Sequence, residues 1–170
     1  MSGPITQEAV PTVASPTLAA LAAAHGPTLY RVAFRYCRNA ADAEDLVQEA
    51  FVVACRKLEQ LREPEAARAW LAQVLRNLWL RQRKRPAPTL SPEAVAAAAA
   101  PESPPERFDR EQLLALLDRM PDEFREPLLL FYFEDFKYRE IAEILGTPIG
   151  TVMSRLARGK AFLRERFVMD

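Results

Sequence analysis

The stretch YREIAEILGTPIGTVMSRLARGK, residues 138–160, predicts a short amphipathic helix, a tight turn and a second helix. Three apolar residues of its first half repeat at helical spacing: Ile141, Ala142 and Leu145. Gly146 can adopt the left-handed conformation that ends a helix, and Pro148 suits the first turn of the next one. We therefore predict a helix-turn-helix, a motif that presents its second helix to the DNA major groove.

The second helix of this motif is expected to bury one stripe and to present the opposite face to DNA. The buried stripe comprises Ile149, Val152, Leu156 and Leu163. The opposite face comprises Gly150, Ser154, Ala157, Arg158 and Ala161, with Thr151 nearby. Small side chains let a DNA backbone approach closely, and Ser and Arg donate to phosphates or base edges. An ordinary basic surface helix is the alternative, but the helix and turn that precede it favour a DNA reader.

Composition allows one domain or two small ones and separates the charges along the chain. The 170 residues are 49% hydrophobic with a formal net charge of zero. Acid gathers at residues 42–49, and base gathers at 76–85 and 155–166, which suggests separate surfaces for separate partners. Two cysteines, Cys37 and Cys55, argue against a disulfide scaffold or zinc site, and the single histidine, His25, argues against a multi-histidine metal site and histidine-assisted catalysis. We see no P-loop and no GxGxxG motif, and we expect no cofactor. We see no signal peptide and no membrane-length apolar run, and we expect a cytoplasmic protein that does not insert into membranes.

The fold expected from the periodicity is all-α, with two small helical domains and a Pro/Ala-rich linker. Residues 1–16 are expected to form a flexible tail, 17–85 an N-terminal helical domain, 86–106 the linker and 107–170 the helix-turn-helix domain. The predicted helices are 17–37, 41–60, 64–85, 107–119, 122–133, 138–145 and 148–167, with a brief one near 93–99 in the linker.

The predicted helix 41–60 has an apolar stripe and an acidic face. The stripe comprises Val47, Ala50, Phe51, Ala54, Leu58 and Leu61. The acidic face comprises Asp42, Asp45 and Glu49, with Gln48 on its flank. Such a face can dock a basic partner helix. It can equally be a solvated face whose acids complement the helix dipole, and the residues alone leave both readings open.

The predicted helix 64–85 also has two sides. Its apolar side comprises Ala67, Trp70, Leu71, Val74, Leu75 and Leu78, and its other side carries Arg68, Arg76, Trp79 and Arg83 around the small Ala72. An exposed Trp among arginines suits single-stranded nucleic acid, because indole stacks on a base while guanidinium groups hold phosphates. The alternative is that Trp79 packs against the first helix or the other domain.

Taken in order, these segments resemble the extracytoplasmic-function sigma factors, small members of the bacterial sigma-70 family. DAEDLVQEAF (42–51) and ARAWLAQVLRNLWL (67–80) resemble helices of the family's region 2, and residues 120–163 resemble region 4. The resemblance covers nearly everything from about Leu18 to Phe167.

This resemblance implies a dissociable initiation subunit that directs core RNA polymerase to promoter DNA and aids melting. The polymerase contacts it implies are Asp42, Asp45, Gln48 and Glu49 on the coiled coil of the largest subunit, with the flap of the second-largest subunit as a further partner. For the −10 element it implies Arg68, Arg76, Asn77, Trp79 and Arg83. For the −35 element it implies Thr151, Ser154, Arg155, Ala157 and Arg158. Relatives are often held inactive by an anti-sigma factor, which makes such a protein a candidate partner.

Two positions depart from the family pattern, and two rival functions remain open from the residues. Met153 stands where many relatives carry Lys or Arg, and Ala157 is small where a larger contact residue is common. One rival is a free-standing helix-turn-helix transcriptional regulator, which gives no reason for the acidic face. The other is a helical interaction module without a nucleic-acid role. In every case we expect no catalytic residue in this chain.

Overall fold

A computed structural model of the protein describes residues 17–61, 63–84 and 110–167, and these residues form helices and no strands. The N-terminal unit comprises α1 (Leu18–Cys37), α2 (Ala40–Arg56), the 3₁₀ turns η1 (Leu58–Gln60) and η2 (Pro64–Ala66), and α3 (Ala67–Lys84). The C-terminal unit comprises α4 (Arg110–Arg119), α5 (Asp122–Tyr132), α6 (Tyr138–Leu145) and α7 (Ile149–Phe167). The all-α expectation is confirmed. The predicted tail, the linker and its brief helix lie outside the described residues.

Local capping explains where several helices begin and end. The Thr17 hydroxyl accepts from the Ala20 N–H at 3.2 Å, and the Asn39 side chain accepts from the first N–H groups of α2. Arg38 ends α1 in the left-handed region with φ 55°. Gly146 ends α6 in the same region with φ 62°, as its sequence position predicts. The turns of the fold therefore follow from short-range chemistry.

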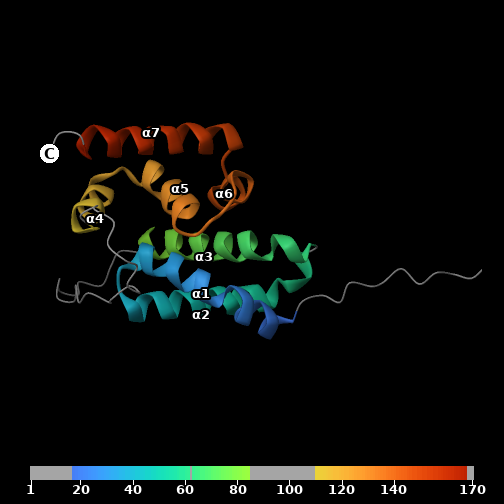
Figure 1. The fold of residues 1–170 in the computed structure, drawn as a ribbon. Coiled ribbons are helices and arrows are strands. Elements are labelled where there is room, and N and C mark those ends of the chain that lie inside the picture. The colour runs from blue at the N-terminus through green and yellow to red at the C-terminus, as the bar shows by residue number, and fades with distance from the viewer. Residues whose placement is uncertain (1–16, 62, 85–109, 168–170) are drawn as a thin grey trace, which may run out of the picture.

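The N-terminal unit is a three-helix bundle in which α1 and α2 run antiparallel beside α3 (Figure 1). Its buried residues on α2 are Ala43, Leu46, Ala50 and Ala54. The predicted stripe is correct at Ala50 and Ala54, whereas Val47 and Phe51 are only half-buried. The stripe is rotated because alanines let α2 approach its neighbours closely, so the small side chains face the core and the larger ones lie at its border.

The C-terminal unit places α6 and α7 as the predicted helix-turn-helix over α5. Val152 and Leu156 are buried as predicted, but Ile149 is 49% exposed because it lies at the very start of α7, beyond the packed turn. Gly159 is buried where α7 crosses α5. A β-carbon there would lie 2.8 Å from Leu128 Cδ1 and 3.3 Å from the Phe124 carbonyl oxygen, so a larger residue at this crossing requires the Leu128 side chain and the α5 backbone to shift.

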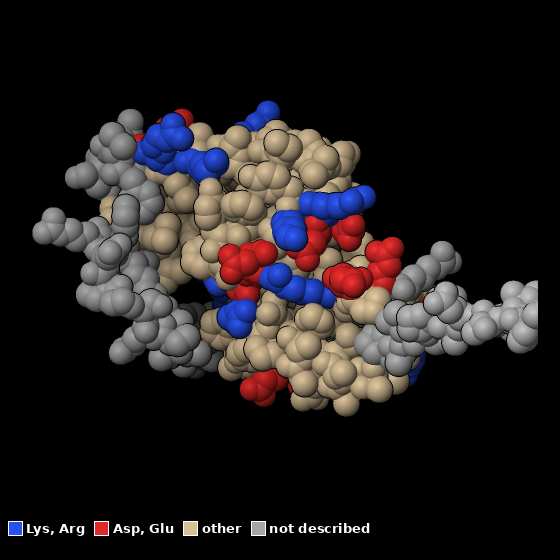
Figure 2. Space-filling model, turned by 45° about the vertical axis from the view of Figure 1, so that its right-hand side comes forward, with Lys and Arg blue, Asp and Glu red and all other residues tan. Residues whose placement is uncertain are grey.

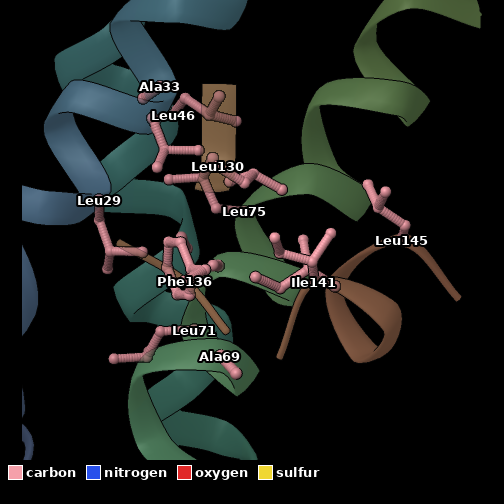
Figure 3. Close-up of a cluster of buried hydrophobic side chains, with 14 of the residues drawn as sticks. Leu29, Ala33, Leu46, Ala69, Leu71, Leu75, Leu130, Phe136, Ile141 and Leu145 are labelled. Carbon is pink, nitrogen blue, oxygen red and sulfur yellow. The ribbon is translucent and has the colours of Figure 1, made fainter. Parts of the chain in front are cut away.

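The two units pack directly on each other through one continuous hydrophobic core. Figure 3 shows Phe136, from the loop between α5 and α6, beside Leu29 of α1 and Leu71 of α3. The predicted apolar side of α3 is correct at Ala67, Leu71, Leu75 and Leu78, whereas Trp70 and Val74 are half-buried. Ala69 and Ala72, outside that predicted side, are buried as well because α6 packs against α3. Helix α3 is thus covered from two directions.

Candidate nucleic-acid and polymerase interfaces

Helix α7 presents its predicted DNA-reading side on the outside of the molecule. Ser154, Ala157 and Arg158 are exposed, and Thr151 and Arg155 are half-buried at the edges. We call these five residues the α7 outer face. Met153, 53% exposed, adds an apolar side chain beside them. The face offers hydroxyl and guanidinium donors on a backbone that small residues leave accessible.

The turn ahead of α7 sets the angle at which this face is presented. The Thr147 N–H donates to the Ala142 carbonyl at 3.0 Å, which closes the end of α6. The Pro148 carbonyl then accepts from the N–H groups of Thr151 at 2.9 Å and Val152 at 3.2 Å, which starts α7. The chain thus passes between the two helices through few residues, and each residue has a defined backbone partner.

The acidic face of α2, which comprises Asp42, Asp45, Gln48 and Glu49, is exposed throughout. Asp42 lies in the first turn, where a carboxylate also complements the helix dipole. Glu49 accepts from the Gln82 amide of α3 at 3.0 Å. Val52, 51% exposed, lies one turn beyond this face and adds an apolar contact that the charge pattern did not reveal. A charged surface with one exposed aliphatic side chain is suited to a basic, partly apolar helix.

The α3 cationic face is gathered on one side of the helix as predicted and comprises Arg68, Arg76, Trp79 and Arg83. Asn77, the fifth residue expected at the −10 element, lies on another side of α3. The exposure of Trp79 on this face differs from the prediction. Trp79 is half-buried and stacks on Tyr36 of α1, with 4.3 Å between ring centroids, and the Arg83 guanidinium lies 4.7 Å from the indole centroid. The expectation of a freely exposed Trp79 is therefore wrong, and the alternative of packing against the first helix is correct. Asn77 is exposed.

A half-buried cluster of hydrogen-bonded side chains lies in the middle of this face. Arg76 donates to Glu126 of α5 through Nε at 2.6 Å and Nη2 at 3.0 Å, and Tyr36 donates to the same carboxylate at 2.7 Å. Burial, followed by the neighbouring Glu126 carboxylate, raises the pKa of Tyr36 well above its usual value. Burial disfavours the charge of Arg76, but its hydrogen bonds to Glu126, the charge of that carboxylate and the interactions with Tyr36 together outweigh burial and raise the pKa of Arg76. The guanidinium therefore stays charged inside the interface.

A cleft of about 640 Å³ opens between the units, next to the acidic face. It is lined by Asp42, Asp45, Trp79 and Arg83 from the N-terminal unit and by Asp118 and Asp122 from the C-terminal unit, among others. Within the described ranges, no group of three or more His, Cys, Asp or Glu side chains is placed to hold a metal ion. No helix in that part of the chain is long and apolar enough to cross a bilayer.

Comparison with known proteins identifies the family. The model of sigma-70 region 2 matches residues 21–87, and that of sigma-70 region 4 matches residues 110–163. SigV of Bacillus subtilis, an RNA polymerase sigma factor, is 32% identical over 149 residues, which cover 86% of this chain and 88% of SigV. The chain belongs to the extracytoplasmic-function sigma factors of the sigma-70 family. The N-terminal unit of this sigma factor thus corresponds to region 2, and its C-terminal unit to region 4.

Further relatives extend the comparison of this sigma factor. SigE of Mycolicibacterium smegmatis, an extracytoplasmic-function sigma factor, is 35% identical over 89% of this chain. The chain spans 62% of the length of SigE and 38% of that of RfaY of Xanthomonas campestris, a probable sigma factor. The solved sigma factor RpoE of Bartonella quintana, in complex with the anti-sigma factor NepR, matches with a TM-score of 0.70 at 28% identity, covering 88% of this chain and 95% of RpoE. These matches do not favour the alternative function, that of a free-standing helix-turn-helix transcriptional regulator.

Sequence reasoning missed the residues that join the two units of the sigma factor. Tyr36, Glu126 and Glu134 drew no attention because isolated polar residues on helices carry no periodic signal. The side chains of Glu126 and Glu134 bind arginines that lie 50 positions away and 99 or more positions away, respectively. Only the packed structure brings such distant charges together.

Proposed function

We propose that this protein directs core RNA polymerase to specific promoters and aids melting of the −10 element. The single observation that carries the proposal is the match of region 2 and region 4, in order, to two helical units with separate exposed faces. Sigma factors are initiation factors without catalysis of their own, so nucleotide addition belongs to the polymerase. We expect the protein to act in the cytoplasm, where polymerase works.

For polymerase binding, we assign the acidic face of α2 to the coiled coil of the largest subunit. Its exposure and its lack of basic residues support that role. A second contact is supported by an apolar groove of about 390 Å³ between α4, α5 and α7, lined by Leu113, Leu117, Leu128, Tyr132 and Phe133, among others. Tyr132 is 52% exposed there, which suits an apolar helix such as one from the flap of the second-largest subunit.

For promoter recognition, we assign the α7 outer face to the −35 element and the α3 cationic face to the −10 element. Two weak contacts on one chain gain affinity through effective concentration, because binding of one unit holds the other near its site. Arginines and an indole on α3 can hold phosphates and stack on an unpaired base, which favours the open strand without ATP.

An anti-sigma factor is a further proposed partner. Support comes from the Bartonella quintana relative, which was solved bound to the anti-sigma factor NepR. Such a partner would inhibit by covering the same faces.

Transcription in vitro with core polymerase on a library of promoter fragments tests the proposal. We expect start sites that depend on this protein and share two spaced sequence elements. Arg158→Ala should abolish most of this activity, because it removes a guanidinium from the α7 outer face. Arg166→Ala, at the far end of α7, is the matched control and should remain active. Transcription that is no different with and without the protein would refute the proposal.

A further inference from the structure

The exposed side of α7 divides into two rows of residues with different chemistry. The α7 apolar row has residues at four-residue spacing and comprises Ile149, Met153 and Ala157. The α7 polar row lies on the other side of Ser154 and comprises Thr151, Arg155 and Arg158. When this helix enters a groove of DNA, its two flanks therefore meet the groove with different groups.

The packing of the C-terminal unit does not use the α7 apolar row. Met153 is 53% exposed and Ile149 is 49% exposed, and in the part of the chain that the structure describes neither packs against the hydrophobic core. A β-carbon added at Gly150, beside them, would meet nothing within 4 Å, and the backbone of Gly150 does not have a positive φ. The fold thus accounts for the buried stripe of α7 but leaves the apolar row available for a contact outside this chain.

The charge around the row indicates that this contact is made in a polyanion. Helix α7 carries no acidic residue from Ile149 to Arg164, and within the described ranges Arg155 and Arg158 form no ion pair. Figure 2 shows acidic side chains along the middle of the molecule, whereas its upper part, where α7 lies in Figure 1, is mostly uncharged surface with basic side chains. Guanidinium groups free to bind phosphates therefore lie beside side chains that cannot bind them.

The major groove of DNA offers one kind of partner to an apolar side chain. Its base edges present hydrogen-bond donors and acceptors, and the C5 methyl of thymine is the only methyl group among them. The phosphates on both sides of the groove need donors, which isoleucine, methionine and alanine side chains lack. The apolar row thus gains from the groove only where it meets the methyl group of a thymine.

Met153 is the residue of this row best placed for such a contact. It lies one turn into α7, and the N-terminal residues of a recognition helix are those that contact base edges. Its unbranched, polarizable side chain adapts to a neighbouring apolar group. Gly150 and Ala157, nearer the centre of the exposed side, are too small to hold the helix away from the bases.

The neighbouring Ser154 favours the same base pair on separate grounds. Its hydroxyl donates to the Thr151 carbonyl at 3.0 Å, which leaves its oxygen as an acceptor. An acceptor on the protein matches an amino group on a base, which adenine and cytosine present in the major groove. A·T is the only base pair that presents both an amino group and a methyl group there.

We propose that Met153 is a specificity-determining residue of this sigma factor: its side chain contacts the C5 methyl group of a thymine in the −35 element. Ser154 accepts from the amino group of an adenine in the same pair or the next one. The assignment of α7 to that element is the proposed function on which this inference rests.

Holoenzyme binding to a promoter from which single methyl groups are removed tests the contact. The probe is the most active promoter fragment from the transcription library, with each thymine of the upstream element replaced in turn by deoxyuridine, which lacks only the methyl group. For holoenzyme formed with the wild-type chain, we expect at least one replacement to weaken binding about fourfold, the ratio that corresponds to one buried CH₂ group. With cytosine at that position, adding a 5-methyl group should strengthen binding by a similar factor.

Two variants of Met153 separate the methyl contact from other effects. Met153→Gln keeps the length of the side chain but removes its apolar end, so we expect thymine and deoxyuridine to be bound equally. Met153→Leu keeps an apolar end and should keep the preference for thymine. Leu114→Gln makes the same chemical change at a 48% exposed site on α4 and is the control that should bind as the wild type does. Helical circular dichroism should be unchanged in all three, because the altered sites are exposed and both new residues are good helix formers.

Three results would overturn the inference while promoter-dependent transcription persists. Wild-type binding that is indifferent to every deoxyuridine replacement excludes a methyl contact. A preference for thymine that survives in Met153→Gln assigns the contact to another residue. An upstream element without an A·T pair contains no thymine for Met153 to read. Absence of promoter-dependent transcription with the wild-type chain would count against the proposed function instead.

Discussion

At the scale of single residues, the polar side chains of this protein differ in whether they face solvent or each other. Arg158 faces outward with no partner required for the packing of α7, whereas Arg76 is held inside an interface by Glu126. Both are arginines on amphipathic helices, and their spacing does not distinguish them. The difference comes from residues far along the chain, which is why sequence patterns predicted the sides of the helices but not the coverage of Trp79.

The two cysteines should differ sharply in reactivity. Burial, followed by the nearby Asp42 carboxylate, raises the pKa of Cys37 to about 11. Since the thiolate is the reactive form, only about one Cys37 in a thousand is reactive at pH 8, and this fraction rises tenfold per pH unit up to the pKa. Cys55 is exposed. We expect iodoacetamide to label Cys55 at least tenfold faster at pH 8, as measured by peptide mass spectrometry. Similar rates at the two sites would contradict the half-buried placement of Cys37.

At the scale of helices, most of the fold could be predicted because its signals are local. The bounds of α6 match the prediction at both ends, since Gly146 and the apolar spacing define them. The error at Ile149 has a different origin, because periodicity cannot tell whether the first residue of a helix reaches the packed region. The acidic face of α2 was recognised in full, but its apolar neighbour Val52 was not.

The proposed role of α3 in melting the −10 element predicts that Trp79→Ala impairs the formation of open complexes. Stacking of an indole on a base contributes about 1–3 kcal/mol, or roughly 5- to 150-fold in the melting equilibrium. We expect the variant to form the closed polymerase–promoter complex normally and to accumulate fewer open complexes, as measured by permanganate reactivity of unpaired thymines. The closed complex of the same variant serves as its control. Open complexes at wild-type levels would show that Trp79 does not contact the melted strand.

At the scale of the whole molecule, the two units are joined by contacts that no local pattern predicts. Arg38, directly after α1, pairs with Asp118 of α4, and Arg31 pairs with Glu134 across 103 positions. Individual partners of this kind depend on how complete helices pack. The arrangement of the two units, which decides whether α3 is accessible, could therefore not be predicted from the sequence.

The Arg38–Asp118 contact makes the packing of the two units sensitive to acid. The hydrogen bond from Arg38 and its charge lower the pKa of Asp118 below its usual value of about 3.8. A lowered pKa means that the contact stabilises the packed arrangement of the two units above about pH 4 and loses this effect as the pH falls through the lowered value. In the full chain with Cys37→Ala and Glu165→Cys, we expect energy transfer between dyes on Cys55 and position 165 to fall below pH 4. Asp118→Asn should remove this part of the pH dependence, and an unchanged curve in that variant would show that the contact does not contribute.

Binding of purified core polymerase is the measurement that tests the central claim most directly. We predict that the wild-type chain binds it and that Asp42→Asn, Asp45→Asn and Glu49→Gln together weaken this binding at least tenfold, because they remove the charge of the acidic face. Glu44→Gln, an exposed acid on another side of α2, is the control and should bind as the wild type does. Absence of binding by the wild-type chain, or equal binding by the triple variant, would contradict the account.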